Sequence, residues 1–106
     1  MRPLAQASVD QFAALGDATR VRVLELLSEK SRPVHDLAAA FDISRPAISR
    51  HLQVLKEAGL VKEEKQGREN LYALQRARLK PLLEWLDSHR ANPARQAKTK
   101  RPRSAT

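Results

Sequence analysis

Apolar residues recur along the chain at intervals of three and four positions, and glycine, proline and polar clusters divide this pattern into short segments. Such spacing is typical of helices that bury one face. It predicts helices over residues 9–15, 18–29, 34–41, 45–58 and about 79–90. Residues 60–65 and 70–74 instead predict two strands joined by a turn over 66–69, where Gly67 supplies a positive φ. The predicted order is α-α-α-α-β-β-α, a mainly α fold with a small β-hairpin (α+β).

The same spacing predicts the inner faces of the first two helices. In the first helix, Phe12 and Leu15 form the apolar side. The second helix follows Asp17, whose carboxylate is a good N-cap. Its inner face is predicted to hold Val21, Leu24 and either Leu26 or Leu27.

The helix over residues 45–58 carries its own start and stop signals. Ser44 is the predicted N-cap, with its hydroxyl accepting a hydrogen bond from the amide of Ala47. Pro46 then lies in the first turn, where a missing amide costs little. Gly59 is predicted just beyond the end, where a left-handed residue closes a helix.

This helix has one apolar face and one basic face. Ile48, Leu52 and Leu55 form the predicted buried stripe, and the opposite face holds Arg45, Pro46, Ser49, Arg50 and Gln53. Arginine can read guanine N7 and O6, and serine and glutamine can contact other base edges. An ordinary solvated helix is the alternative. The short turn before the helix and the hairpin after it favour the recognition helix of a winged helix-turn-helix.

Charge and composition narrow the class of partner. The chain has 106 residues and a formal net charge of +8, of which +5 lies in residues 91–106, leaving +3 for residues 1–90. We expect one DNA-binding and dimerisation domain over 1–90 and a basic, disordered tail over 91–106. A basic chain favours an anionic partner, nucleic acid first and a membrane surface second.

Several classes of site are not expected. The chain has no cysteine, which excludes disulfides and thiolate metal sites. No apolar run approaches the length of a membrane span, and residues 1–10 lack the hydrophobic region of a secretory signal, so we expect a cytoplasmic protein with no membrane partner. There is no nucleophile–base–acid set and no glycine-rich phosphate loop, so an enzyme is not expected.

Three sequence motifs, in order, resemble the ArsR family of winged-helix repressors: LGDATRVRVLELL, VHDLAAAFDISRPAISRHLQVLKEAGLV and KQGRENLYAL. The resemblance implies a homodimeric transcriptional repressor at a palindromic operator in double-stranded DNA of the bacterial nucleoid. The recognition helix would enter the major groove, and the wing over residues 65–70 would reach the backbone. The DNA-binding residues expected from the helix face and the resemblance are Ser44, Arg45, Pro46, Ser49, Arg50, His51, Gln53, Lys65 and Arg68. For His51, a hydrogen bond within the motif is the alternative.

The resemblance also implies a homodimer formed by the first and last helices. The last helix carries a leucine stripe and the only tryptophan, a residue type enriched at interfaces. The expected interface consists of Phe12, Leu79, Leu82, Leu83, Trp85 and Leu86. A ligand pocket beside Trp85 is the alternative.

Members of this family have two kinds of metal site, and this sequence has the complete ligand set of neither. Many family members bind metal through a cysteine pair at the start of the third helix, where this chain has Pro33-Val34-His35. Others use an Asp-x-His pair followed by His-x-x-Glu in the last helix. Asp87 and His89 match the first half, and nothing matches the second. The chain therefore resembles the metal-independent members, and we expect no metal and no cofactor; the sequence does not identify an inducer.

A non-specific architectural DNA-binding protein is the alternative function. In that case, the basic tail over residues 91–106 would provide most of the binding by neutralising phosphates.

Overall fold

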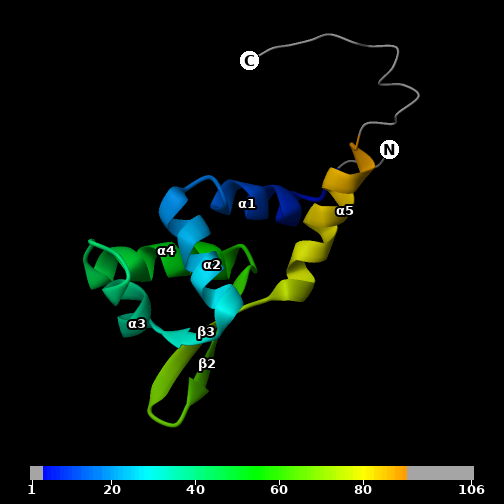
Figure 1. Ribbon diagram of the computed structural model, residues 1–106. Helices are drawn as coiled ribbons and strands as arrows, with labels where there is room; N and C mark the ends of the chain where they lie inside the picture. The colour runs from blue at the N-terminus through cyan, green and yellow to red at the C-terminus, as the bar shows by residue number, and fades with distance from the viewer. Residues whose placement is uncertain (1–3, 91–106) are drawn as a thin grey trace.

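The computed structural model of the protein describes residues 4–90, and the predicted basic tail lies outside the described residues. Figure 1 shows short helices gathered on one side of a small antiparallel sheet, whose hairpin projects away from them. The elements are α1 (Gln6–Ala14), α2 (Ala18–Glu29), β1 (Arg32–Pro33), α3 (Val34–Ala39), α4 (Arg45–Glu57), β2 (Val61–Gln66), β3 (Glu69–Leu74), the 3-10 turn η1 (Arg76–Leu79) and α5 (Lys80–Ser88). The predicted mainly α winged fold is confirmed, and η1 leads directly into the predicted last helix, which begins at Lys80.

The sheet has a third strand that the sequence pattern did not predict. Its order is β1-β3-β2, and both pairs are antiparallel. Residues 32 and 33 pair with Tyr72 and Leu71 of β3. Two residues are too few to show alternation, and one of them is a proline, which argues against a central strand. The predicted hairpin is present, and its last pair, Gln66 with Glu69, leaves a two-residue turn.

The first helix differs from its prediction in both start and orientation. Helix α1 begins at Gln6 and not near residue 9, and its buried residues are Ser8, Gln11 and Ala14. Phe12 is only partly buried, because its ring packs against α5 at the edge of the domain. Leu15 packs against the core as predicted, but the most buried positions of this helix hold polar and small side chains.

Helix α2 has the predicted bounds and N-cap, and its inner face is as predicted at Leu24 and at Leu26 and Leu27, but not at Val21. The Asp17 carboxylate accepts hydrogen bonds from the amides of Thr19 and Arg20 at 2.9 and 3.1 Å. The buried residues are Val23, Leu26 and Leu27. The prediction for Val21 is wrong: it is exposed. Since 21 and 23 lie about 200° apart around a helix, both could not face the core.

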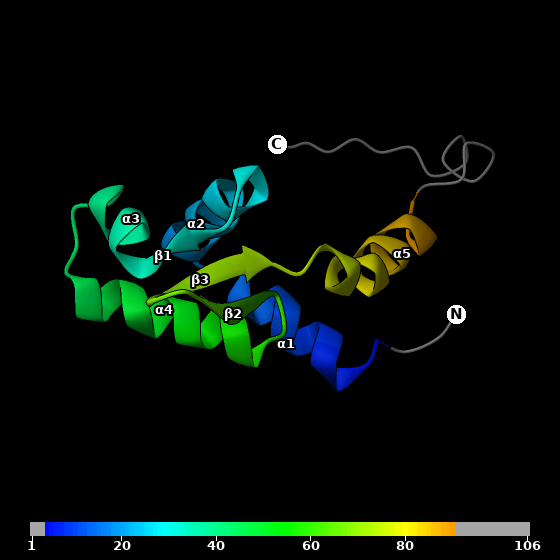
Figure 2. The same cartoon turned by 90° about the horizontal axis from the view of Figure 1, so that it is seen from below.

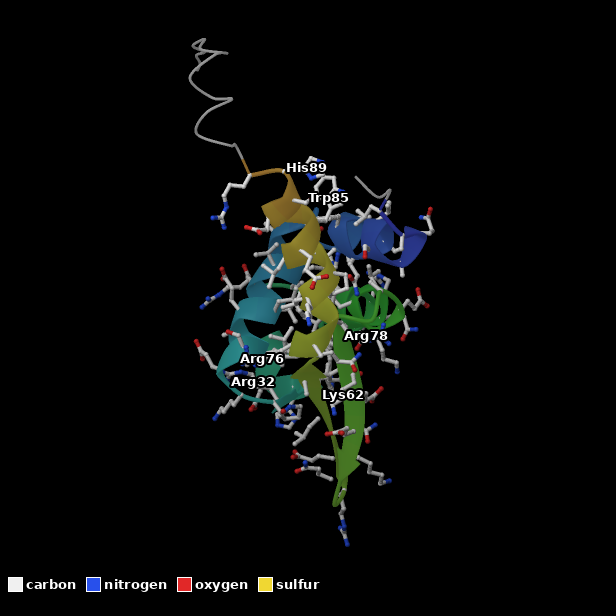
Figure 3. All side chains as sticks on the ribbon, turned by 90° about the vertical axis from the view of Figure 1, so that its right-hand side faces the viewer. Arg32, Lys62, Arg76, Arg78, Trp85 and His89 are labelled. Carbon is white, nitrogen blue, oxygen red and sulfur yellow. The ribbon has the colours of Figure 1, made fainter. Side chains whose placement is uncertain are left out.

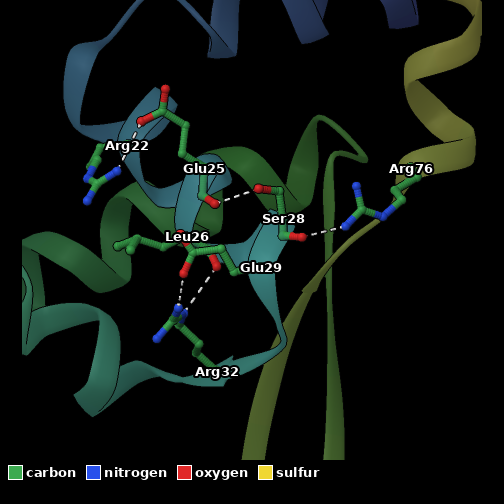
Figure 4. Close-up of polar contacts among 7 residues, drawn as sticks. All are labelled: Arg22, Glu25, Leu26, Ser28, Glu29, Arg32 and Arg76. Atoms are coloured by element: carbon green, nitrogen blue, oxygen red, sulfur yellow. Dashed lines mark hydrogen bonds and ion pairs between the residues drawn. The ribbon is translucent and has the colours of Figure 1, made fainter.

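The C-terminal end of α2 is completed by arginines from outside the helix (Figure 4). Arg32 donates to the carbonyl oxygen of Leu26 at 3.1 Å and pairs with Glu29 at 2.7 Å. Arg76, which follows β3, donates to the carbonyl oxygen of Ser28 at 2.6 Å. Guanidinium groups suit the negative end of the helix dipole and satisfy carbonyls that have no partner within the helix.

The core lies where α2, α3 and α4 meet the base of the hairpin. The predicted α4 stripe is confirmed, since Ile48, Leu52 and Leu55 are buried. The other core residues are Ala14, Val23, Leu26, Leu27, Leu37, Leu60 and Val61. In Figure 2 the hairpin lies beside α4, while α5 stands apart from it next to α1. The fold thus separates a hairpin-and-α4 side from an α1-and-α5 side.

Candidate nucleic-acid interface

Both ends of α4 are fixed by local sequence, as predicted. The Ser44 hydroxyl accepts from the amide of Ala47 at 3.2 Å, and the proline lies in the first turn. At the other end Gly59 has φ of 80°. The amides of Gly59 and Leu60 donate to the carbonyl oxygens of residues 56 and 55, both at 3.0 Å, which is the Schellman ending. The length and direction of α4 are therefore set from within its own segment.

The outer face of α4 is exposed and basic near its N-terminus. Arg45, Ser49 and Arg50 are all exposed, and the helix is held by the buried stripe on its other side. Gln53 is also exposed, but its side-chain amide donates to Glu57 at 2.9 Å. Three of the predicted contact residues are thus presented together, and Gln53 would have to leave its partner to contact a base.

His51 faces into the protein. Its Nδ1 lies 3.3 Å from Nη1 of Arg20 and 4.0 Å from a carboxylate oxygen of Asp17. The structure therefore separates His51 from the outer face on which the other predicted DNA-binding residues of α4 lie, and its contacts are to α2 and not within the helix-turn-helix.

Arg20 connects the three helices behind the candidate interface. Its Nε donates to the carbonyl oxygen of Ala14 at the end of α1, at 2.7 Å. Its guanidinium also lies 3.9 Å from Asp17 and contacts His51 of α4. The hydrogen bond from the Arg20 amide is the main cause that lowers the pKa of Asp17, with smaller contributions from the positive charges nearby. The sequence pattern predicted the cap at Asp17 but not the contacts of Arg20 with α1 and α4, because His51 is 31 positions away along the chain.

The wing presents two further cations. Lys65 and Arg68 lie at the exposed end of the hairpin. Within residues 4–90, the predicted DNA-binding cations Arg45, Arg50, Lys65 and Arg68 form no ion pair. In contrast, Lys62 on the other face of β2 pairs with Glu64 at 2.9 Å. Because these four cations have no such partner, they can bind phosphates without first breaking an ion pair.

The inner face of the hairpin carries Glu63, an acid that the sequence pattern did not mark as part of the site. The Glu63 carboxylate pairs with Nζ of Lys56 on α4 at 2.9 Å and accepts from Nδ2 of Asn70 on β3 at 2.9 Å. The hydrogen bond between Lys56 and Glu63 lowers the pKa of Glu63 and raises that of Lys56. Burial, followed by the Glu63 charge, raises the pKa of Tyr72, which is opposite Glu63 in the register. Strand alternation was the available signal, since it puts 63 on the same face as the buried Val61.

A groove of about 230 Å³ lies between the start of α4, the start of α3 and the hairpin. Arg45 and Arg68 both line it, so the structure brings together one predicted helix residue and one predicted wing residue. His35 also lines it, and its Nε2 lies 3.9 Å from a carboxylate oxygen of Glu69 at the wing. Glu63 is in the lining too, so the groove carries both signs of charge.

The predicted dimer residues divide into two groups. Leu82 is 3% exposed and Leu79 packs against the core, so both already contact their own chain. Phe12 and Trp85 meet edge to face with ring centroids 5.6 Å apart, which joins α1 to α5. Leu83 and Leu86 remain 63% and 51% exposed. This leaves an apolar strip on α5, formed by Leu83 and Leu86, that residues 4–90 do not cover.

Asp87 and His89 match half of the metal-binding motif described above. Both have partners nearby, either in α5 or directly after it. Asp87 pairs with Arg90. The Nδ1 of His89 lies 2.9 Å from the carbonyl oxygen of Trp85, and its ring lies over the indole with centroids 4.3 Å apart. Figure 3 shows Trp85 and His89 together at the far end of α5. In the described part of the chain, no three His, Cys, Asp or Glu side chains are grouped so that they could hold a metal ion.

No helix among residues 4–90 is long and apolar enough to cross a membrane.

Comparison with known proteins identifies the class. Residues 17–63 match the model of the arsR family of bacterial regulatory proteins. The chain is 35% identical over 75 residues to the transcriptional repressor SdpR of Bacillus subtilis (strain 168), covering 71% of this chain and 83% of that one. The crystal structure of a possible transcriptional regulator for arsenical resistance has a TM-score of 0.70 and 38% identity, covering 87% of this chain and 98% of that chain.

A homodimeric winged helix-turn-helix DNA-binding domain from Mycobacterium bovis, solved by NMR, has a TM-score of 0.64 and 29% identity, covering 81% of this chain and 87% of that one. The chain therefore belongs to the arsR family of bacterial regulatory proteins, and its fold is a winged helix-turn-helix. The family consists of regulators, which supports a role other than that of an enzyme.

Proposed function

We propose that the protein is a homodimeric, sequence-specific repressor of transcription that binds a palindromic operator in the bacterial nucleoid. One observation carries this proposal. The exposed side chains of Arg45, Ser49 and Arg50 lie on the outer face of α4, where neither arginine forms an ion pair with another described residue, and Arg45 shares a groove with Arg68 of the wing.

The chemistry of this surface fits duplex DNA. Arg45 and Arg50 can each make two hydrogen bonds to a guanine, and Ser49 can donate to or accept from a neighbouring base. The start of α4 favours phosphate through its dipole and free amides. Lys65 and Arg68 then neutralise phosphates beside the groove that α4 occupies. Base reading is thus assigned to the helix and backbone contact to the wing.

The dimer is supported by the uncovered strip on α5 and by the homodimeric neighbour from M. bovis. We place Leu83 and Leu86 in the interface, with Phe12 and Trp85 supporting α5 from within each chain. Two copies related by a two-fold axis would present their α4 helices to half-sites about one helical turn, ~34 Å, apart. A palindromic operator follows from that symmetry.

The proposed regulator does not depend on a metal. Asp87 and His89 already have partners within the chain, and Pro33-Val34-His35 occupies the place of a cysteine pair.

The test is selection of a binding sequence from a pool of random duplexes, followed by affinity measurements on the selected duplex and on a scrambled one. We expect Arg45→Ala and Arg50→Ala to reduce the ratio of the two affinities, at a cost of ~1–3 kcal/mol on the selected duplex. Arg68→Ala should weaken both duplexes alike. Arg22→Ala, which removes an exposed arginine paired with Glu25 on α2, is the matched control.

Two outcomes would contradict this function. If no duplex is enriched over random DNA, the protein is not sequence-specific. If deletion of residues 91–106 removes nearly all binding, the architectural alternative is favoured over the proposed repressor.

A further inference from the structure

One carboxylate joins the hairpin to the recognition helix. The Oε1 of Glu63 pairs with Nζ of Lys56 in the last turns of α4 at 2.9 Å, and its Oε2 accepts from the side chain of Asn70 on β3 at 2.9 Å. Within residues 4–90 this is the one polar side-chain contact between α4 and the hairpin strands. Glu63 therefore touches α4 and both strands at once.

The surroundings of Glu63 make this contact stronger than an ordinary surface pair. Its side chain is 24% exposed, against 51% for Glu64, which points to the opposite face of β2 and pairs with Lys62. Partial burial reduces screening of the attraction by solvent. Tyr72, opposite Glu63 in the register, is half-buried beside it on β3.

The wing cations lie beyond this contact. Gln66, the last residue of β2 before the turn that carries Arg68, is three positions after Glu63, which at ~3.3 Å per residue puts the turn about 10 Å from the contact. A rotation of the hairpin by ~10° about Glu63 would move that turn by roughly 2 Å, which is more than the width of the whole range of hydrogen-bond distances. A small change in angle at Glu63 thus decides whether Lys65 and Arg68 reach a phosphate.

We infer that Glu63 is a positioning residue for DNA binding, which holds the wing at the angle where its cations contact phosphates while α4 occupies the major groove. Glu63 itself is an acid beside a polyanion and makes no favourable contact with DNA. The inference rests on the proposed function, because it assumes that α4 and the wing bind the same duplex.

The test compares Glu63→Ala with Glu64→Ala on the selected duplex over a range of salt concentrations. Both variants remove one negative charge from the same strand, and each frees one lysine partner. Charge alone would tighten binding in both. We expect Glu63→Ala to bind roughly tenfold more weakly than Glu64→Ala, since each of two wings loses a contact of the size of an exposed ion pair. The slope of log affinity against log salt concentration should also be shallower by about 2 for Glu63→Ala. Each of the two wings loses one phosphate contact, and each contact contributes ~0.9 to the slope.

A second comparison separates positioning from folding. In a Lys65→Ala/Arg68→Ala background, Glu63→Ala should bind no more weakly than Glu64→Ala, because neither of the two proposed contact cations is left to position and only the common effect of charge remains. If the loss persists there, or if Glu63→Ala and Glu64→Ala behave alike, the inference is overturned. Should Glu63→Ala fail to fold, Glu63→Gln keeps an acceptor for Asn70 and should show the same shallower salt slope. Absence of specific binding by the unmodified protein would instead overturn the proposed function.

Discussion

Replacement of Gly59 by alanine tests how the recognition helix is joined to the wing. Gly59 ends α4 with φ of 80°, and Val61 begins β2 two residues later. Its carbonyl oxygen also accepts from the side-chain amide of Gln75 at 3.1 Å. Any residue with a β-carbon must either adopt the left-handed conformation or break the hydrogen bonds that close the helix.

The magnitude follows from two contributions. Forcing an L-residue into the left-handed region costs ~1–2 kcal/mol. The new β-carbon would lie 3.1 Å from Nη1 and 3.4 Å from Cζ of Arg78, which is the flexible end of a side chain and can move aside. The total should therefore be close to the backbone cost alone. For a domain of this size that corresponds to a fall in Tm of about 4–16 °C.

Urea unfolding followed by circular dichroism would measure this change. Gly67→Ala is the matched control, because Gly67 has φ of 61° and a β-carbon there would meet nothing within 4 Å. The two variants share the backbone strain and differ in the contact with Arg78. A Gly59→Ala protein within ~0.3 kcal/mol of the original would refute the reasoning, since the left-handed ending would then not be required.

Three further predictions address pH, assembly and metal. The folded-state pKa of Asp17 is lowered, chiefly by the Arg20 amide, so its charged form stabilises the fold above its ordinary pKa of 3.8, and this contribution is lost as pH falls through the folded value. Asp17→Asn keeps the cap but cannot titrate, and acid titration of its unfolding free energy should show a smaller loss between neutral pH and pH 3. Leu83→Glu should give a monomer in sedimentation and weaken operator binding at least tenfold. The control, Val21→Glu, changes another exposed apolar residue and should remain a dimer. If both variants are dimers, Leu83 is not in the interface. Zinc or a chelator should leave operator affinity unchanged, and a zinc-dependent shift would disprove metal independence.

Local signals were sufficient where an element is determined by its own residues. The cap at Ser44, the closing glycine after α4 and the hairpin turn all appear as predicted, because each depends on backbone conformations and hydrogen bonds within a few positions. The buried stripe of α4 was also predictable, since its period and length leave one consistent face. The winged helix-turn-helix follows from these elements and their order.

The predictions failed where a short segment has several possible faces. In α1, the apolar Phe12 suggested one orientation, but the helix buries Gln11 and Ala14. In α2, Val21 and Val23 compete for the inner face, and packing against the other helices chose Val23. Strand β1 exists only because β3 offers partners for it.

The sequence by itself determined where α4 starts and ends, which of its residues face outward, and that the outward face is basic, because these depend on spacing along one helix. The tertiary structure alone decided that His51 turns inward to Arg20 and that Glu63 joins α4 to the hairpin. These contacts connect residues that are distant along the chain or on different elements. Their geometry depends on how whole elements pack, and no local pattern of apolar and polar residues encodes it.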